Sequence, residues 1–206
     1  MATQTPLLTE SCFLLRMPER LRQMSEDEFF EFCVANRDLR IERTAEGDIV
    51  IMPPAGGETG GSNFNIARQL GNWAKADGTG KGFDSSTGFT LPSKAVSAPD
   101  ASWILMSRWK KLPKANRRRF AHICPDFVIE LKSPSDSMPF LESKMEEYIA
   151  NGARLGWLID PDGRRVHIYR PNRTVVILDD VSSVSADPEL SGFTLELGEI
   201  WNPDAE

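Results

Sequence analysis

Apolar and polar positions along the chain follow two periods, which together predict a fold that mixes strands and helices. Short apolar runs bounded by turn residues predict strands near residues 41–53 (a hairpin), 89–91, 100–105, 126–132, 155–159, 166–169 and 174–178. Apolar residues at helical spacing predict helices that begin after residue 25 and that cover roughly residues 58–76 and 138–150. Strands and helices therefore alternate, as they do in α/β proteins.

Two of the predicted helices carry specific signals. Ser25 is followed three residues later by Glu28, which is the pattern of an N-terminal capping box. In the helix over residues 58–76, we expect Phe64, Ala67 and Leu70 to lie on the buried face, together with either Trp73 or Ala74. The sequence thus predicts where one helix begins and which residues form the buried face of another.

The strand, helix, strand order across residues 126–159 predicts a right-handed crossover between two parallel strands. The hairpins on either side make the predicted sheet mixed. We therefore expect a three-layer α/β/α domain with a central mixed sheet over residues 25–206. Residues 1–24 show no clear period and are expected to form an N-terminal arm.

Composition and charge narrow the class of protein. The chain has 206 residues, of which 40% are apolar and 26% charged, as in an ordinary soluble globule. No apolar run approaches the roughly 20 residues of a membrane span, and a secretory signal pattern is absent. The three cysteines form neither a disulfide framework nor a metal-knuckle spacing. We expect a cytoplasmic protein.

Charged residues in the strand over residues 126–132 point to chemistry. Side chains alternate along a strand, so Glu130 and Lys132 should share a face at the end of an apolar run. Placing charges there costs stability unless they pair or bind an ion. A carboxylate can hold Mg²⁺, and a neighbouring lysine can orient an attacking water. The pattern therefore predicts a metal-assisted hydrolytic site.

A second carboxylate is needed, and two acids that follow prolines are candidates. Asp126 lies four residues before Glu130 on the same strand, about 13 Å away at a rise of roughly 3.3 Å per residue. That separation is too large for one shared ion. Asp100 opens a different strand, which can pair beside the Glu130 strand. We expect Asp100 to be the partner.

The residues Pro99-Asp100 and Glu130-Leu131-Lys132 resemble the signature of the PD-(D/E)XK nuclease superfamily. A longer run is similar to a branch of bacterial proteins labelled restriction endonucleases; it comprises residues 125–136, Lys144, Tyr148, Gly152, 156–161 and 166–170. The resemblance implies a restriction-endonuclease-like fold and a DNA endonuclease activity that depends on Mg²⁺ or Mn²⁺. It also implies a homodimer for double-strand cleavage.

The resemblance assigns roles to particular residues. It places the metal-binding acids at Asp100 and Glu130 and the catalytic lysine at Lys132. We add the Leu131 carbonyl as a candidate further ligand. In the wider superfamily a glutamate on the helix before the core strands supports the metal site, which makes Glu58 a secondary candidate. The alternative is that Glu58 only favours the helix dipole.

One basic connection lies between the two candidate strands, although the net charge of the chain is −6. We expect it to lie next to the site and to bind the DNA backbone. The alternative is a solvated loop. Its residues are Arg108, Lys110, Lys111, Lys114, Arg117, Arg118 and Arg119.

Two further possibilities stay open at this point. The chain can instead be a catalytically silent nuclease fold that acts as a nucleic-acid-binding or protein-interaction module. Lys144 can face the site from the helix over residues 138–150, although an exposed helix cation paired with a nearby acid is the simpler interpretation. The sequence does not predict a nucleotide-binding loop, since the GxxxxGK[ST] and GxGxxG spacings are absent.

Overall fold

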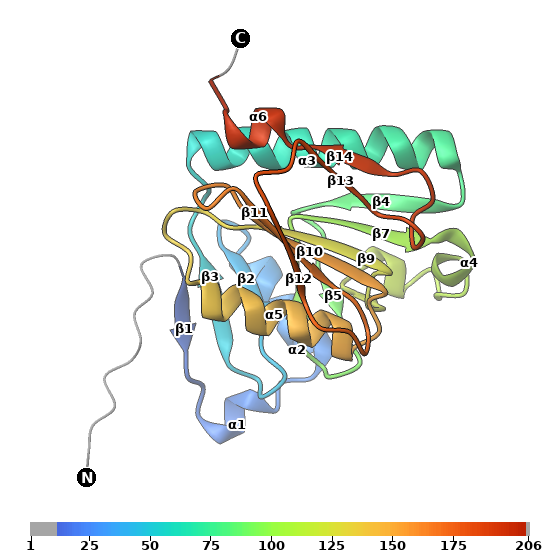
Figure 1. Ribbon diagram of the computed structural model, residues 1–206. Helices are drawn as coiled ribbons and strands as arrows, with labels where there is room; N and C mark the ends of the chain where they lie inside the picture. Colours follow the sequence, from blue (N-terminus) through green and yellow to red (C-terminus); the bar gives the residue numbers. More distant parts are fainter. Residues whose placement is uncertain (1–11, 205–206) are drawn as a thin grey trace.

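A mixed six-stranded sheet forms the centre of the structure, a computed structural model that describes residues 12–204 (Figure 1). Its strands, in spatial order, are β12 (Val176–Asp179), β11 (Arg165–Tyr169), β10 (Leu155–Asp160), β9 (Phe127–Leu131), β7 (Ala101–Leu105) and β4 (Gly80–Asp84). The one parallel pair of neighbouring strands described in this sheet is β9 and β10, and helix α5 (Met138–Ala150) connects them. The expected mixed sheet and its parallel pair are confirmed.

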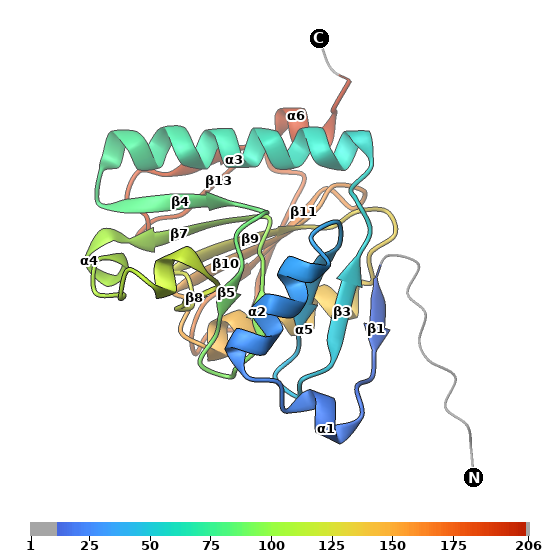
Figure 2. The ribbon, with the colours of Figure 1, turned by 180° about the vertical axis from the view of Figure 1, so that it is seen from behind.

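Helices cover both faces of this central sheet (Figures 1 and 2). The long helix α3 (Gly57–Asp77) lies across one face, together with the C-terminal elements β13 (Ser183–Ser185), β14 (Thr194–Glu196) and α6 (Gly198–Trp201). Helix α5 packs against the other face. Odd-numbered residues of β9, such as Phe127 and Ile129, pack toward α3, whereas Val128 packs toward α5. This alternation places Glu130 on the α5 side.

A second six-stranded sheet lies beside the α5 layer and brings the N-terminal third of the chain to the site. Its strands, in spatial order, are β1 (Phe13–Leu15), β3 (Ile49–Met52), β2 (Arg40–Arg43), β6 (Val96–Ser97), β5 (Phe89–Thr90) and β8 (Ala121–His122). The expected hairpin is β2 and β3, which pair antiparallel. Helix α2 (Glu26–Ala35) packs on this sheet through the buried ring of Phe29.

Short helices complete the fold. They are α1 (Glu19–Arg22), α4 (Met106–Trp109) and the 3-10 helix η1 (Asn116–Arg118). Among the described residues, no helix has both the length and the apolar character needed to cross a membrane.

Part of the expected N-terminal arm belongs to the second six-stranded sheet. Residues 1–11 lie outside the described residues, but Phe13–Leu15 form β1 and pair with Ile49–Ile51 of β3. The arm was expected because this segment shows no clear period. Its short apolar run instead forms an edge strand, whose side chains remain largely exposed.

The buried face of α3 differs from the expected one at Phe64. Leu70 and Ala74 are buried as predicted, but the Phe64 side chain is 71% exposed. The helix meets the sheet through Ile66, Leu70 and Ala74, which are four residues apart, and Phe64 lies off this stripe. An aromatic residue that the pattern assigns to the core is therefore at the surface.

Candidate active site

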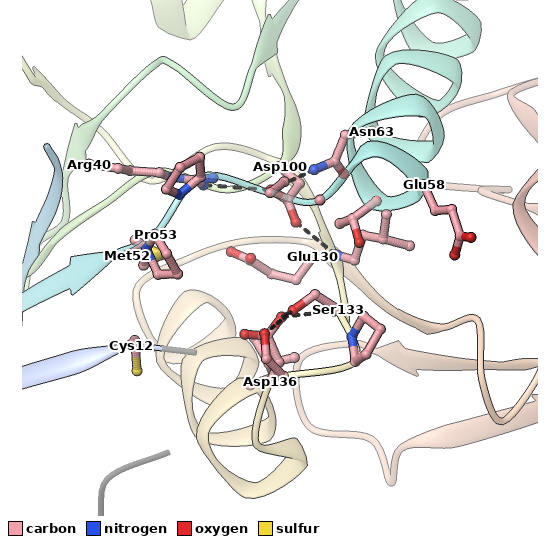
Figure 3. A pocket seen from close by; sticks show the side chains of 18 of the residues that line it. Cys12, Arg40, Met52, Pro53, Glu58, Asn63, Asp100, Glu130, Ser133 and Asp136 are labelled. Carbon is pink, nitrogen blue, oxygen red and sulfur yellow. Dashed lines mark hydrogen bonds and ion pairs between the residues drawn. The ribbon is translucent and has the colours of Figure 1, made fainter. Parts of the chain in front are cut away.

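Two buried carboxylates meet at one end of the central sheet. Asp100 lies directly before β7, and Glu130 is the fourth residue of β9. The strands are antiparallel, with Ala101 opposite Ile129, so both acids lie at the same end. They line one cavity of about 620 Å³ (Figure 3). Asp126 lies directly before β9, at the opposite end of the strand, and instead pairs with Arg108 at 2.8 Å.

The Asp100 carboxylate is held on several sides. Its Oδ2 accepts the Leu131 backbone N–H at 2.9 Å, and its Oδ1 accepts the Asn63 amide at 3.3 Å. The Arg40 guanidinium of β2 lies 3.6 Å from Oδ1. Burial raises the pKa of Asp100, and the Arg40 charge and the Leu131 hydrogen bond lower it, with a net increase. The orientation of this carboxylate is therefore set before any ligand arrives.

Glu130 accepts two donors from α5. The Lys144 ammonium lies 2.9 Å from its Oε1, and the Tyr148 hydroxyl donates to the same oxygen at 3.0 Å. Burial raises the pKa of Glu130 to about 7, against the opposing effect of Lys144 and with further increases from Asp100 and Glu42. The Glu130 carboxyl group therefore changes between its protonated and ionised forms near neutral pH.

Lys144 is a buried member of this cluster. Its Nζ lies between Glu130 at 2.9 Å and Glu42 of β2 at 3.1 Å. Burial lowers the pKa of Lys144, but the two carboxylates more than offset this and hold it above its usual range. The interpretation of Lys144 as an exposed helix cation is therefore wrong, because α5 turns this side chain toward the interface between the two sheets.

The cluster contains one more acid than base. Glu42, Asp100 and Glu130 face only two cations, Arg40 and Lys144. Full ionisation would leave an excess negative charge in a buried region, which is costly unless a proton or a cation joins it. Glu42 also accepts the Ala98 N–H at 2.9 Å.

This donor set suits a hard cation. Within the described part of the chain, no group of three or more His, Cys, Asp and Glu side chains could hold a metal. Mg²⁺ however is commonly held by one or two carboxylates and several waters. Asn63 lies beside Asp100, and its buried Oδ1 lacks a hydrogen-bond partner among the described residues. Asp100, Glu130 and neighbouring oxygens therefore fit a divalent cation.

Lys132 is not beside Glu130. Strand β9 ends at Leu131, and the Lys132 ammonium lies 3.5 Å from Asp160 and 3.3 Å from Asp162. It lines a separate cavity of about 350 Å³ with Glu58 and Trp201, on the α3 side of the sheet. The expectation of a shared face fails because Ser133 and Pro134 turn the chain away before the strand period can continue.

The other two metal-site candidates have different positions. Glu58 is exposed in the first turn of α3 and borders both cavities, with its carboxylate directed away from Asp100 and Glu130 in Figure 3. Leu131 lines the larger cavity, and its N–H fixes Asp100. Asp136 accepts the Ser133 N–H at 2.8 Å, so it caps this turn.

The basic connection lies at the far end of the sheet, which corrects its expected position. Because β7 and β9 are antiparallel, the chain leaves β7 at Leu105, away from Asp100 (Figure 1). Arg108 neutralises Asp126, and Arg119 pairs with Asp27. The structure therefore does not bring the proposed DNA-binding residues to the cavity: Arg108, Lys110, Lys111, Arg117, Arg118 and Arg119.

Sequence reasoning missed the two residues that β2 contributes. Arg40 and Glu42 flank Ile41, so they share one side of the strand. Glu42 is only 4% exposed and Arg40 pairs with Asp100. Charges alternating with an apolar residue were the available signal, but that pattern is also typical of a half-exposed strand.

Comparisons with known proteins agree with this architecture. A family model described as "Uma2: Putative restriction endonuclease" matches residues 26–198. The chain is also similar to the crystal structure of a putative nuclease belonging to DUF820 from Anabaena variabilis ATCC 29413. That similarity has a TM-score of 0.68 and 23% sequence identity, and it covers 86% of this chain and 97% of the other. No curated protein matches the chain.

Proposed function

The chain belongs to the Uma2 family, described as putative restriction endonucleases, and we propose that it hydrolyses DNA phosphodiester bonds with a divalent cation. The observation that carries this proposal is the pairing of Asp100 and Glu130 at the wall of one cavity, with Lys144 against Glu130. The family match and the restriction-endonuclease-like fold support a nuclease-like function. The metal and the reacting residues are our own inference.

Asp100 and Glu130 would hold Mg²⁺ or Mn²⁺, with the Leu131 carbonyl as a further ligand. The cation would lower the pKa of a bound water and offset the charge that develops on the phosphate. Arg40, Asn63 and the Leu131 N–H keep the Asp100 carboxylate oriented for this task. Tyr148 does the same for Glu130, and its raised pKa keeps its hydroxyl a donor.

In this proposal Lys144 takes the role that the resemblance assigns to Lys132. Its ammonium lies at Glu130, whereas that of Lys132 is occupied by Asp160 and Asp162. Because the pKa of Lys144 is raised, it acts as a fixed cation rather than as a general base. A cation there stabilises the negative charge of the transition state.

The test is a cleavage assay of purified protein on plasmid DNA and on single-stranded DNA, with Mg²⁺ or Mn²⁺. Glu130→Ala, purified in the same way, controls for contaminating nucleases. We expect cleavage by the wild type alone. If neither protein cleaves and neither cation raises the melting temperature, the proposal is wrong and the catalytically silent binding module becomes the better description.

A further inference from the structure

Besides the smaller cavity at Lys132, another cavity, which we call the second cavity, adjoins the candidate active site along the flank of α3. It has a volume of about 720 Å³ and shares Arg40, Asn63 and Asp100 with the first cavity. The segment between β3 and α3 also borders both. The second cavity adds Phe64 and Arg68, which neither the cluster of buried charges nor the proposed hydrolysis uses.

Phe64 is unusual for a residue on a helix that packs on a sheet. Its side chain is the most exposed of the large apolar side chains in the described part of the chain, at 71%. It makes no contribution to the core stripe through Ile66 and Leu70. An exposed aromatic ring beside a polar cavity is a suitable platform for a planar ligand, because ring stacking buries apolar area on both partners.

Two arginines in this cavity can contact an anionic ligand, although three carboxylates also line it. Arg68 lies one helical turn beyond Phe64 and is exposed, with Glu199 no closer than 3.9 Å. Arg40 reaches the cavity from β2, and its Nε is buried without a hydrogen-bond partner among the described residues. Asp38 and Asp84 also line the cavity, so room for phosphate contacts is confined to the two arginines.

We propose that this second cavity binds an unpaired nucleotide of single-stranded DNA, with its base stacked on Phe64 and its phosphates near Arg40 and Arg68. The inference rests on the proposed function, since it takes the strand to continue from the phosphate at Asp100 and Glu130. Aromatic ring, arginine and carboxylate line one continuous path along α3.

Burial of the acids disfavours an intact duplex. Asp100 and Glu130 are 8% and 3% exposed, so a phosphate must enter the cavity to reach them. Bases in a duplex are paired and stacked, which keeps their faces from Phe64. Duplex binding also needs many phosphate contacts, and the basic connection lies at the opposite end of the sheet.

The test measures binding of fluorescein-labelled 12-nucleotide oligothymidine and of a 12-base-pair duplex by fluorescence anisotropy, with Mg²⁺ on ice. We expect the single strand to bind more tightly than the duplex. Stacking on one aromatic side chain predicts that Phe64→Ala weakens strand binding about tenfold, whereas Phe64→Trp retains it. Val34→Ala, a truncation of another exposed apolar side chain on α2, should leave binding unchanged.

Salt dependence gives an independent measure. With two arginines at the cavity, the logarithm of the association constant should fall with log salt with a slope of about −1.4. Equal binding by wild type and Phe64→Ala, or tighter binding of the duplex, overturns the inference.

Cleavage of the same oligonucleotides separates this inference from the proposed function. Cleavage of DNA with no effect of Phe64→Ala on binding leaves the nuclease in place and removes the stacking site. Phe64-dependent binding of the strand without any cleavage keeps the stacking site and removes the proposed nuclease activity.

Discussion

Lys132 and Lys144 have different surroundings in the structure. Lys144 lies between buried carboxylates, and Lys132 lies at a partly exposed turn with Asp160 and Asp162. We expect Lys144→Gln to lower kcat at least about 100-fold, as loss of a positioned transition-state donor does. Lys132→Gln should change kcat by less than about fivefold, since its ammonium pairs with Asp160 and Asp162 and does not line the cavity of Asp100 and Glu130.

The melting temperatures of both variants control for misfolding, because Lys144 neutralises buried acids. Lys144→Arg keeps the charge and should retain part of the activity. If Lys132→Gln abolishes cleavage while Lys144→Gln cleaves normally, the catalytic lysine is Lys132 after all.

The titration of Glu130 couples cation binding to pH. Its pKa of about 7 means that at pH 6 a cation must displace a proton, whereas at pH 8 the carboxylate is already ionised. We expect Mg²⁺ affinity to be about tenfold weaker at pH 6 than at pH 8, or about 1.4 kcal/mol. Thermal melts across Mg²⁺ concentrations at both pH values measure this difference.

Without a cation, the same group has the opposite effect on stability. The folded protein binds this proton more tightly than the unfolded chain does, so stability falls as pH rises from the ordinary pKa of 4.5 to about 7. Glu130→Gln should remove both effects. An Mg²⁺ response that is the same at pH 6 and pH 8 in the wild type contradicts this account.

At the level of elements, close packing of β4 against β7 depends on one glycine. A Cβ added to Gly80 would overlap the indole ring of Trp103, which is 2% exposed. Overpacking of this kind costs about 1–3 kcal/mol, so Gly80→Ala should lower the free energy of unfolding by that amount. Urea denaturation measures it.

Gly82→Ala is the matched control on the same strand. The nearest atom to its added Cβ is the Ser102 carbonyl oxygen at 3.9 Å, which is ordinary contact. Equal stability losses in the two variants would show that any side chain added at these glycines destabilises β4, and that overlap with Trp103 is not the cause.

Local signals predicted most elements well. The Ser25 capping box forms as expected, with Ser25 Oγ accepting the Glu28 N–H at 3.2 Å. The predicted helix over residues 138–150 is α5 to the residue. The C-terminal elements β13, β14 and α6 were not predicted, because their short segments are stabilised by packing on α3 rather than by a period of their own.

The candidate site was less predictable, since it depends on contacts between distant segments. The pairing of β7 with β9 brings Asp100 to the end of the sheet that holds Glu130. Asp100 was expected there because Asp126 lies too far from Glu130 along the same strand. The positions of Glu42 and Lys144 depend on how the two sheets meet across α5, which no local pattern encodes. The location of the basic connection required knowing that β7 and β9 run in opposite directions.

At the scale of the whole molecule, basic surface and acidic cavity are at opposite ends of the central sheet. The exposed residues Lys110, Lys111 and Lys114 follow β7 at the end away from Asp100. Replacing all three by serine should therefore change cleavage of a 12-nucleotide strand by less than about twofold, because surface substitutions remote from a site have small effects. Steady-state rates of the variant and the wild type give the comparison.

The 12-nucleotide substrate distinguishes two possible positions of these lysines relative to the DNA. The triple variant should still cleave the short strand if its lysines contact only distant parts of a long DNA. Loss of short-strand cleavage would place these lysines in the path to the cavity.

The pairing of Glu42 with Lys144 also has a consequence for how the protein is made. The two residues are 102 positions apart in the chain. At a synthesis rate of about 5–20 residues per second, Glu42 leaves the ribosome roughly 5–20 s before its partner. During that interval its carboxylate stays hydrated, since burial without a cation is costly. The nascent chain therefore keeps this acid open to water until translation delivers the lysine that closes over it.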